Sequence, residues 1–138
     1  MKERGKIEKL WREEKYRVLF HDQNSYHSIR TLLKSPTTLD EVEEHIANAL
    51  TITPTKGSVI NAFEHMWGYF KKQCTQYEKQ HSRELKKLYI ENQIDYFELL
   101  SFLKNLADKY AVEYLQQSTI LNITKSFNNY VTSYKMNT

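Results

Sequence analysis

Residues 55–72 read TKGSVINAFEHMWGYFKK and form the most informative part of the chain. Apolar side chains recur in this segment at steps of three and four, which places them on one face of a helix. They are Val59, Ile60, Phe63, Met66, Trp67 and Phe70. The pattern predicts a helix over about Val59–Cys74 that turns this face toward a core, with Ser58 as its N-cap.

Most of the remaining chain follows the same helical pattern. The 138 residues include only 3 glycines and 2 prolines, so few positions force a turn and long helices are favoured. A first helix is predicted over about Lys6–Leu33, and Ser35-Pro36 ends it because the residue before a proline avoids the α conformation. A second, acidic helix is predicted over about Leu39–Leu50, opened by a capping box between Thr38 and Glu41.

Three more helices are predicted toward the C-terminus. One covers about Gln76–Gln93 and starts from a second capping box, formed by Thr75 and Glu78. Another covers about Asp95–Tyr110, and the last begins near Ala111 and runs to about Leu121.

The composition fits one helical domain. Hydrophobic residues make up 40% of the chain, which is enough for one core at this length. We therefore expect an all-α fold, a single compact helical domain of five to six helices over residues 1–138. Residues 122–138 are rich in Asn, Ser, Thr and Tyr and are expected to form a short helix or a loosely packed end.

The cysteine and hydropathy patterns indicate the compartment. Cys74 is the only cysteine, so a disulfide within the chain is impossible and a cysteine-bound metal cluster is not expected. The five histidines show no zinc-binding spacing, and we expect neither a metal nor a cofactor. No apolar run reaches the roughly 18–20 residues that cross a bilayer, and no apolar signal core follows the charged N-terminus. We expect a cytoplasmic protein without membrane contact. The sequence does not predict its oligomeric state.

Charge is unevenly distributed along the chain. Residues 1–17 contain 7 basic and 4 acidic side chains, and residues 55–87 contain 7 basic and 3 acidic ones. Residues 37–50 contain 4 acidic side chains and no lysine or arginine. Two basic segments separated by an acidic one predict a polarised surface, with ordinary solvated helix faces as the alternative.

A second face of the helix in residues 55–72 carries polar groups. At steps of three and four it presents Asn61, His65, Gly68, Tyr69 and Lys72. Such groups suit a bound nucleotide, because the amide can read a base edge, the rings can stack, and the ammonium can meet phosphates together with Lys71 and Lys56. The alternative is that the histidine and the tyrosine only bridge neighbouring helices.

The start of this helix adds a candidate anion site. Lys56-Gly57-Ser58 combines a cation with free backbone amides at a helix N-terminus, an arrangement that attracts negative groups. In the alternative interpretation Ser58 only caps the helix.

The middle of the predicted first helix, residues 15–27 (KYRVLFHDQNSYH), is polar between apolar flanks. Lys15, Asp22 and Tyr26 share one face at steps of seven and four, and His21 lies beside them. Polar groups inside a buried helix cost free energy unless each is paired, so this stretch predicts a pocket or, alternatively, a hydrogen-bonded structural network. No catalytic residue is assigned, although His21, Asp22 and His65 would supply acid–base groups if the protein were an enzyme.

The chain resembles the YbgA family in three groups of residues, over roughly residues 10–121. They are Leu10-Trp11 with Lys15-Tyr16, His21 and Tyr26; Lys56-Gly57-Ser58-Val59-Ile60-Asn61 with His65 and Gly68-Tyr69-Phe70-Lys71-Lys72; and the weaker Tyr114-Leu115-Gln116-Gln117. The central group is the most specific of the three, because its glycines, asparagine, histidine and GYFKK run all fall in order.

This resemblance implies a function. Members of the YbgA family occur alone or fused behind a TudS-type desulfidase domain, which removes sulfur from thiouracil-like bases with a cysteine-bound iron–sulfur cluster. The YbgA-like part of the fused proteins is the part expected to bind thiolated tRNA. By resemblance, this chain is the RNA-holding part without the cluster, and its single cysteine agrees with that division.

The chain departs from the family pattern at several positions. Lys56 stands where the family usually has arginine, and Val59 where it has histidine. The fifth predicted helix lacks the prolines and the histidine of the family in residues 93–104, and the residues after Leu121 also diverge. If the fifth helix lines the family's site, binding by this chain differs or is weaker.

We therefore expect an RNA-binding module for tRNA or another structured RNA, specifically a tRNA carrying a thiolated uridine, that uses a basic surface and a polar pocket. The residues expected to contact the RNA are Lys15, His21, Tyr26, Lys56, Ser58, Asn61, His65, Tyr69, Lys71 and Lys72. Two alternatives stay open. One is a small enzyme acting on a modified nucleobase or nucleoside, and the other is a protein-interaction domain that docks a separate desulfidase.

Overall fold

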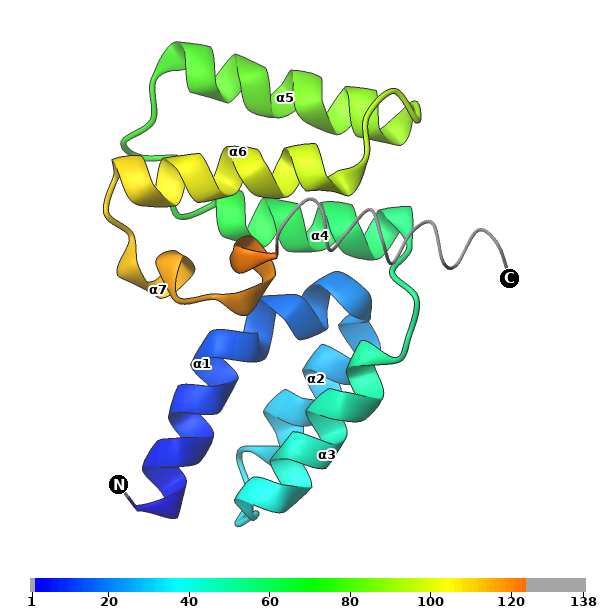
Figure 1. Cartoon of the computed structure of the whole chain (residues 1–138), viewed down its shortest axis with the longest axis vertical. Coiled ribbons are helices and arrows are strands. Elements are labelled where there is room, and N and C mark those ends of the chain that lie inside the picture. The colour runs from blue at the N-terminus through cyan, green and yellow to red at the C-terminus, as the bar shows by residue number, and fades with distance from the viewer. Residues whose placement is uncertain (1, 124–138) are drawn as a thin grey trace.

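The computed structural model describes residues 2–123, and every regular element in that range is a helix. In chain order the elements are α1 (Glu3–His21), α2 (Gln23–Leu32), α3 (Leu39–Leu50), α4 (Lys56–Trp67), α5 (Gln76–Ile90), α6 (Tyr96–Lys109), α7 (Glu113–Gln116) and the 3₁₀ helix η1 (Thr119–Asn122) (Figure 1). The predicted all-α fold is confirmed for this range. The described part has more helices than the five to six expected, because two predicted helices are each divided. Residues 124–138, the bulk of the predicted C-terminal segment, lie outside the described residues.

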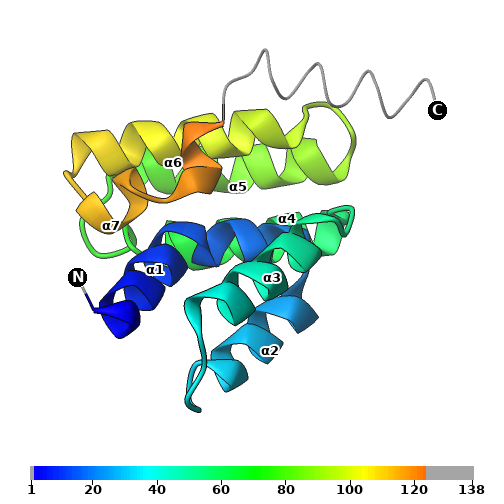
Figure 2. The ribbon, with the colours of Figure 1, turned by 60° about the horizontal axis from the view of Figure 1, so that its bottom comes forward.

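Helix α4 lies at the centre of the fold. It packs on α1 on one side and on α6 on another, and α6 in turn packs against α5 (Figure 1). Helices α1, α2 and α3 contact one another and form a second group, which α1 connects to α4 (Figure 2). Both α7 and η1 lie against α6, and η1 also contacts α1, so the last described residues join the two groups.

A helix break lies within the polar run of the first predicted helix. Asp22 has extended backbone angles (φ −162°, ψ 118°) and separates α1 from α2. Its carboxylate accepts from the backbone amide of Ser25 at 2.9 Å and from the Ser25 hydroxyl at 2.7 Å, which caps α2. The prediction of one helix over Lys6–Leu33 was wrong because the apolar spacing continues across the break, while the cap is a local property of one aspartate.

The two predicted capping boxes mark helix starts correctly. Thr75 and Glu78 form a reciprocal box at the start of α5, with N···O distances of 2.9 and 3.1 Å. Thr38 accepts from the Glu41 amide at 3.1 Å, as predicted for α3. The Glu41 carboxylate accepts from the Thr37 hydroxyl at 2.8 Å instead of reaching back to Thr38, so the second half of that box is absent.

Helix α4 has different ends from those predicted. Thr55 is its N-cap, and the two hydroxyls of Thr55 and Ser58 each accept from the other residue's backbone amide, at 3.0 and 2.9 Å. Ser58 is therefore a first-turn partner and not the cap. The helix ends at Trp67 and not near Cys74, because Gly68 is a poor helix former and the following turns use bonds between residues three apart.

Left-handed residues end the next two helices. Asn92 (φ 62°) follows α5 and Ala111 (φ 51°) follows α6. After each, an amide bonds back across five residues, from Gln93 to Leu88 and from Val112 to Ala107, as in a Schellman motif. The predicted last helix therefore starts later, as α7. Extended angles at Ser118 (φ −72°, ψ 123°) then separate α7 from η1.

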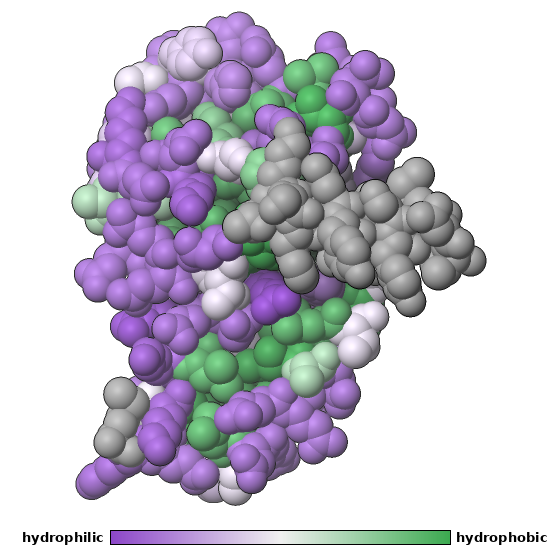
Figure 3. Space-filling model, in the orientation of Figure 1, coloured by the Kyte–Doolittle hydropathy of each residue, from purple (hydrophilic) through white to green (hydrophobic). Residues whose placement is uncertain are grey.

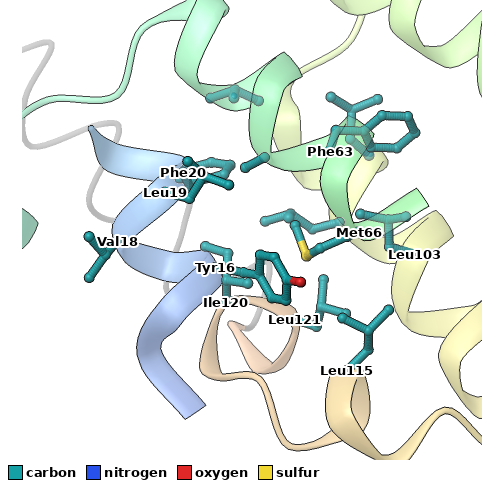
Figure 4. Packing of buried hydrophobic residues seen from close by; sticks show 14 of the residues in the cluster. Tyr16, Val18, Leu19, Phe20, Phe63, Met66, Leu103, Leu115, Ile120 and Leu121 are labelled. Carbon is teal, nitrogen blue, oxygen red and sulfur yellow. The ribbon is translucent and has the colours of Figure 1, made fainter. Parts of the chain in front are cut away.

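The core follows the predicted apolar face of α4. Five residues of this face are buried, namely Val59, Phe63, Met66, Trp67 and Phe70. Its sixth residue, Ile60, is partly buried. Met66 lies between Leu19 of α1 and Leu103 of α6 (Figure 4). Since these three side chains are at most 1% exposed, α4 is enclosed from two sides.

Apolar side chains also show on the surface, in a seam between α1 and α3 (Figure 3). Leu10 and Leu39 line a shallow cavity of about 370 Å³ there. Two lysines of α1 and two glutamates border it, so the charges around this seam balance.

Glu78 is a carboxylate that the fold buries, since only 8% of the residue is exposed. It accepts from the Lys109 ammonium at 2.7 Å, from the Tyr110 hydroxyl at 2.6 Å and from the Thr75 amide at 2.9 Å. Burial by itself raises the pKa of Glu78, but these hydrogen bonds outweigh burial and lower the pKa to about 2. The network fastens the start of α5 to the end of α6.

Replacing Glu78 with glutamine is expected to reduce the free energy of unfolding by about 2 kcal/mol at neutral pH, because hydrogen bonds to a charged acceptor are lost. The pKa of Glu78 is lowered from 4.5 to about 2 on folding, so the carboxylate stabilises the protein above pH 4.5 and this contribution disappears as the pH falls toward 2. Urea unfolding at several pH values measures the effect. The difference between the wild type and Glu78→Gln shrinks on acidification, and a constant difference would contradict the ionised network.

Candidate functional site

Three tyrosines from distant parts of the chain meet where α1, α4 and α7 come together. The hydroxyls of Tyr16 on α1 and Tyr69, just after α4, are hydrogen-bonded at 2.7 Å. The rings of Tyr69 and Tyr114 are stacked with their centroids 6.0 Å apart and an interplanar angle of 25°. Tyr16 is set edge-on to both, at 6.1 and 6.2 Å. These three residues are called the tyrosine cluster below.

Cationic side chains border the tyrosine cluster. The Lys15 ammonium lies 5.4 Å from the centre of the Tyr16 ring and 5.8 Å from that of Tyr114, within cation–π range. Burial lowers the pKa of Lys15, and the nearby charge of Arg30 lowers it further. Arg30 itself lies over the ring of Tyr26, 5.7 Å from its centre. Two cations and a fourth tyrosine therefore surround the cluster.

The cluster has a buried base and an accessible rim. Tyr16 is 5% exposed, whereas Tyr69 is 37% exposed and Tyr114 is half-buried. Burial raises the pKa of Tyr16 well above its ordinary value, and the hydrogen bond to Tyr69 adds to this shift. Burial also raises the pKa of Tyr114. The phenol of Tyr114 therefore stays protonated at neutral pH, so its ring at the rim is uncharged.

Three of the predicted contact residues, Lys15, Tyr26 and Tyr69, come together at this junction. Tyr26 is 6% exposed and packs on Trp11 with ring centroids 5.8 Å apart, so it supports the junction from within. Tyr16 and Tyr114 were not among the predicted contact residues. Both stand in segments that resemble the YbgA family, which was the signal available, but side-chain direction at a three-helix junction cannot be read from spacing.

The side chains of His21 and Asp22 both form hydrogen bonds with backbone groups. The Nδ1 atom of His21 is 2.7 Å from the carbonyl oxygen of Ile52, which ties the end of α1 to the loop before α4. Asp22 caps α2 through Ser25. The proposed acid–base pair therefore has its carboxylate engaged in a helix cap.

Lys56 and Ser58 stabilise helix ends. The Lys56 ammonium donates to the carbonyl oxygens of Tyr89 at 3.0 Å and Ile90 at 2.7 Å, the last residues of α5. Carbonyl groups in the last turn of a helix lack the usual amide partners four residues on, so a lysine is a favourable partner for them, and the Tyr89 carbonyl also accepts from the Asn92 amide at 3.1 Å. Ser58 takes part in the capping box of α4. The predicted anion site at the start of α4 thus has its lysine engaged by α5.

The remaining predicted residues lie on or near the surface of α4. His65 is exposed in its last turn, and Lys71 and Lys72 are exposed in the turns that also carry Tyr69. Asn61 is half-buried, and its amide nitrogen has no hydrogen-bond partner among the described residues. Lys15 and Tyr69 therefore combine a place at this junction with some access to solvent, and Lys71 and Lys72 are exposed two and three residues after Tyr69.

Comparison with known families matches residues 15–124 to a family described as "Protein of unknown function (DUF1722)". The chain belongs to the DUF1722 family. This is the YbgA-like family that the sequence resembles, and the match includes all three residues of the tyrosine cluster. No curated protein and no solved structure gave a match. Among the helices of residues 2–123, none combines the length and the apolar character needed to cross a bilayer.

The Tyr16→Phe variant is expected to lose about 1 kcal/mol of unfolding free energy, because a half-buried hydrogen bond to Tyr69 disappears while the ring remains. Urea denaturation followed by circular dichroism measures it. Tyr77→Phe is the matched control, since Tyr77 is 75% exposed. Equal stability of the two variants would show that the Tyr16–Tyr69 hydrogen bond does not hold the cluster together.

Proposed function

We propose that this protein binds structured RNA, and specifically a tRNA that carries a thiolated uridine, with the tyrosine cluster as the place where a base stacks. The observation that carries the proposal is the stacked pair of Tyr69 and Tyr114 next to Lys15. Single-stranded RNA bases are recognised by stacking on aromatic rings, with cations nearby for the phosphates.

The geometry favours a pre-organised platform. Tyr16 is buried below and holds Tyr69 through its hydroxyl, so the accessible ring has a fixed orientation before any ligand arrives. A ring that is already ordered loses little conformational entropy on binding. The platform joins three chain segments that resemble the family pattern, which supports a function shared across the DUF1722 family.

The exposed lysines after α4 supply the sequence-independent part of binding. Lys71 and Lys72 follow Tyr69 by two and three residues and are exposed. Phosphate contacts of this kind position a nucleic acid and make its affinity fall with salt. His21, Asp22, Lys56 and Ser58 hold the scaffold, and the proposal gives them no direct contact with RNA.

The thiolated uridine is the finer part of the proposal and rests on the family resemblance. A thiocarbonyl sulfur is more polarizable than a carbonyl oxygen, and sulfur makes favourable contacts with aromatic rings. A platform of tyrosines is therefore compatible with a preference for the thiolated base.

Replacing Tyr69 or Tyr114 with alanine is expected to weaken tRNA binding about tenfold, because stacking contributes ~1–3 kcal/mol per base. Fluorescence anisotropy with total tRNA measures the dissociation constant, and Tyr77→Ala is the control for losing an exposed tyrosine elsewhere. Matched tRNA with and without thiolation tests the finer proposal. Unchanged affinity in both cluster variants would rule out the platform, and equal affinity for the two tRNAs would rule out the sulfur preference.

The double variant Lys71→Glu, Lys72→Glu is expected to bind tRNA more weakly at low salt. The slope of the logarithm of affinity against the logarithm of salt concentration is expected to become shallower by the amount that about two phosphate contacts contribute. A salt series in the same assay gives that slope. Lys104→Glu is the control, since Lys104 is an exposed cation on α6. Its neighbour Lys109 is left unchanged because it donates to Glu78. An unchanged slope in the double variant would remove these lysines from the interface.

A further inference from the structure

A second cavity lies between α4 and α5, both of which pack on α6. It has a volume of about 340 Å³, which falls in the range of small-ligand sites. Glu64 and Trp67 line it from one face of α4, and Ser82 and Arg83 line it from α5. None of the tyrosine cluster residues lines this cavity, although Lys71, which is assigned above to phosphate contacts, does.

The cavity concentrates positive charge. Four cations line it, Lys71, Lys79, Arg83 and Lys86, against the single carboxylate of Glu64. Glu64 is already ion-paired with Lys86. No ion pair joins any of the other three cations to a residue in the range 2–123. Like charges gathered without a counter-charge repel one another, and a bound anion relieves this repulsion.

Ser82 gives an independent indication of a ligand. The residue is 1% exposed, and its hydroxyl has no hydrogen-bond partner among the described residues. A buried hydroxyl without a partner costs about 1–3 kcal/mol. Because Ser82 lines the cavity beside Arg83, an oxygen-rich anion bound there would satisfy the hydroxyl and the guanidinium together.

An adjoining apolar cavity extends the site. It has a volume of about 390 Å³ and shares Glu64, Arg83 and Lys86 with the first. Its other lining side chains include Ile60 and Ile90, and Ile90 is 55% exposed. A cationic hollow next to an apolar one fits a ligand that has a charged end and an apolar or aromatic body.

We propose that the groove between α4 and α5 binds a phosphate monoester with an organic body, of the class of a nucleoside 5′-monophosphate. The phosphate occupies the cationic cavity at Ser82 and Arg83, and the body lies against Ile60 and Ile90. The ligand is either a free nucleotide or the 5′-terminal nucleotide of an RNA, since both present the same group. A phosphate carries about −1.5 to −2 charges and accepts several hydrogen bonds, which matches this donor set better than a carboxylate of an acidic peptide does.

Titration of the full chain with adenosine 5′-monophosphate, followed by calorimetry and by amide chemical shifts, tests the proposal directly. Arg83→Ala is expected to weaken binding about tenfold and Ser82→Ala a few-fold, because a charge-assisted and a neutral hydrogen bond are lost. Lys104→Ala is the control, since Lys104 is an exposed cation on α6 outside the groove. Chemical-shift changes at the amides of Ser82 and Arg83, rather than only at those of Tyr69 and Tyr114, assign the bound nucleotide to this groove and not to the proposed stacking platform. Circular dichroism confirms that each variant is folded.

The two sources of the ligand are distinguished with short RNAs. Tighter binding of a 5′-phosphorylated oligonucleotide than of its 5′-hydroxyl form, lost in Arg83→Ala, identifies an RNA end, whereas equal binding of the two RNAs alongside saturable nucleotide binding identifies a free nucleotide. The proposal fails if adenosine binds as tightly as its monophosphate, or if Lys104→Ala weakens binding as much as Arg83→Ala. It also fails if an oligoglutamate peptide displaces the nucleotide at equal charge, or if no titration is seen up to about 10 mM.

Discussion

The packing of α4 on α1 and on α6 is the constraint on which the rest of this structure depends. Ala62 and Met66 of α4 are fully buried and Phe63 is 2% exposed, so the face of the helix that packs on its neighbours is removed from water. What remains accessible is confined to its flanks. Tyr69 meets Tyr16 of α1 on one flank, and Glu64 meets Lys86 of α5 on another. Both candidate binding regions therefore lie beside the same buried helix, which fixes their positions relative to one another.

Local side-chain chemistry made much of the fold predictable. The apolar face of α4 gave the core, and the Thr75–Glu78 and Thr38–Glu41 pairs gave the starts of α5 and α3, because a cap depends on residues only three positions apart. The helix break at Asp22 was not predicted because the helical spacing of apolar residues persists on both sides of it. Thr55 was not predicted as the N-cap of α4, because Ser58 is an equally good capping residue by type.

The candidate site was only partly predictable. Lys15, Tyr26 and Tyr69 were expected to contribute, and they lie together at the junction. Their neighbours Tyr114 and Arg30 depend on how α7 and α2 cross α1, and crossing geometry is set by packing rather than by spacing along one helix. Lys56 could not be placed from its sequence neighbours, because a lysine before a glycine and a serine suggests an anion site, while the fold directs its ammonium to the end of α5.

Charge counts along the sequence also overstate what is available to a ligand. Residues 55–87 contain 7 basic side chains. Within that segment Lys56 is occupied by backbone carbonyls and Lys86 by Glu64. The positive field that a partner meets is thus concentrated on fewer side chains, chiefly around the α4–α5 groove and the turns after α4.

Two contacts of different kinds connect α4 to α5. Lys56 at the start of α4 donates to uncharged carbonyl groups at the end of α5, and Glu64 forms an ion pair with Lys86 farther along the two helices. Dissolved ions weaken an accessible pair of opposite charges more than a contact with neutral oxygens. Raising the ionic strength therefore weakens the Glu64–Lys86 contact before it weakens the contact that Lys56 makes with the end of α5.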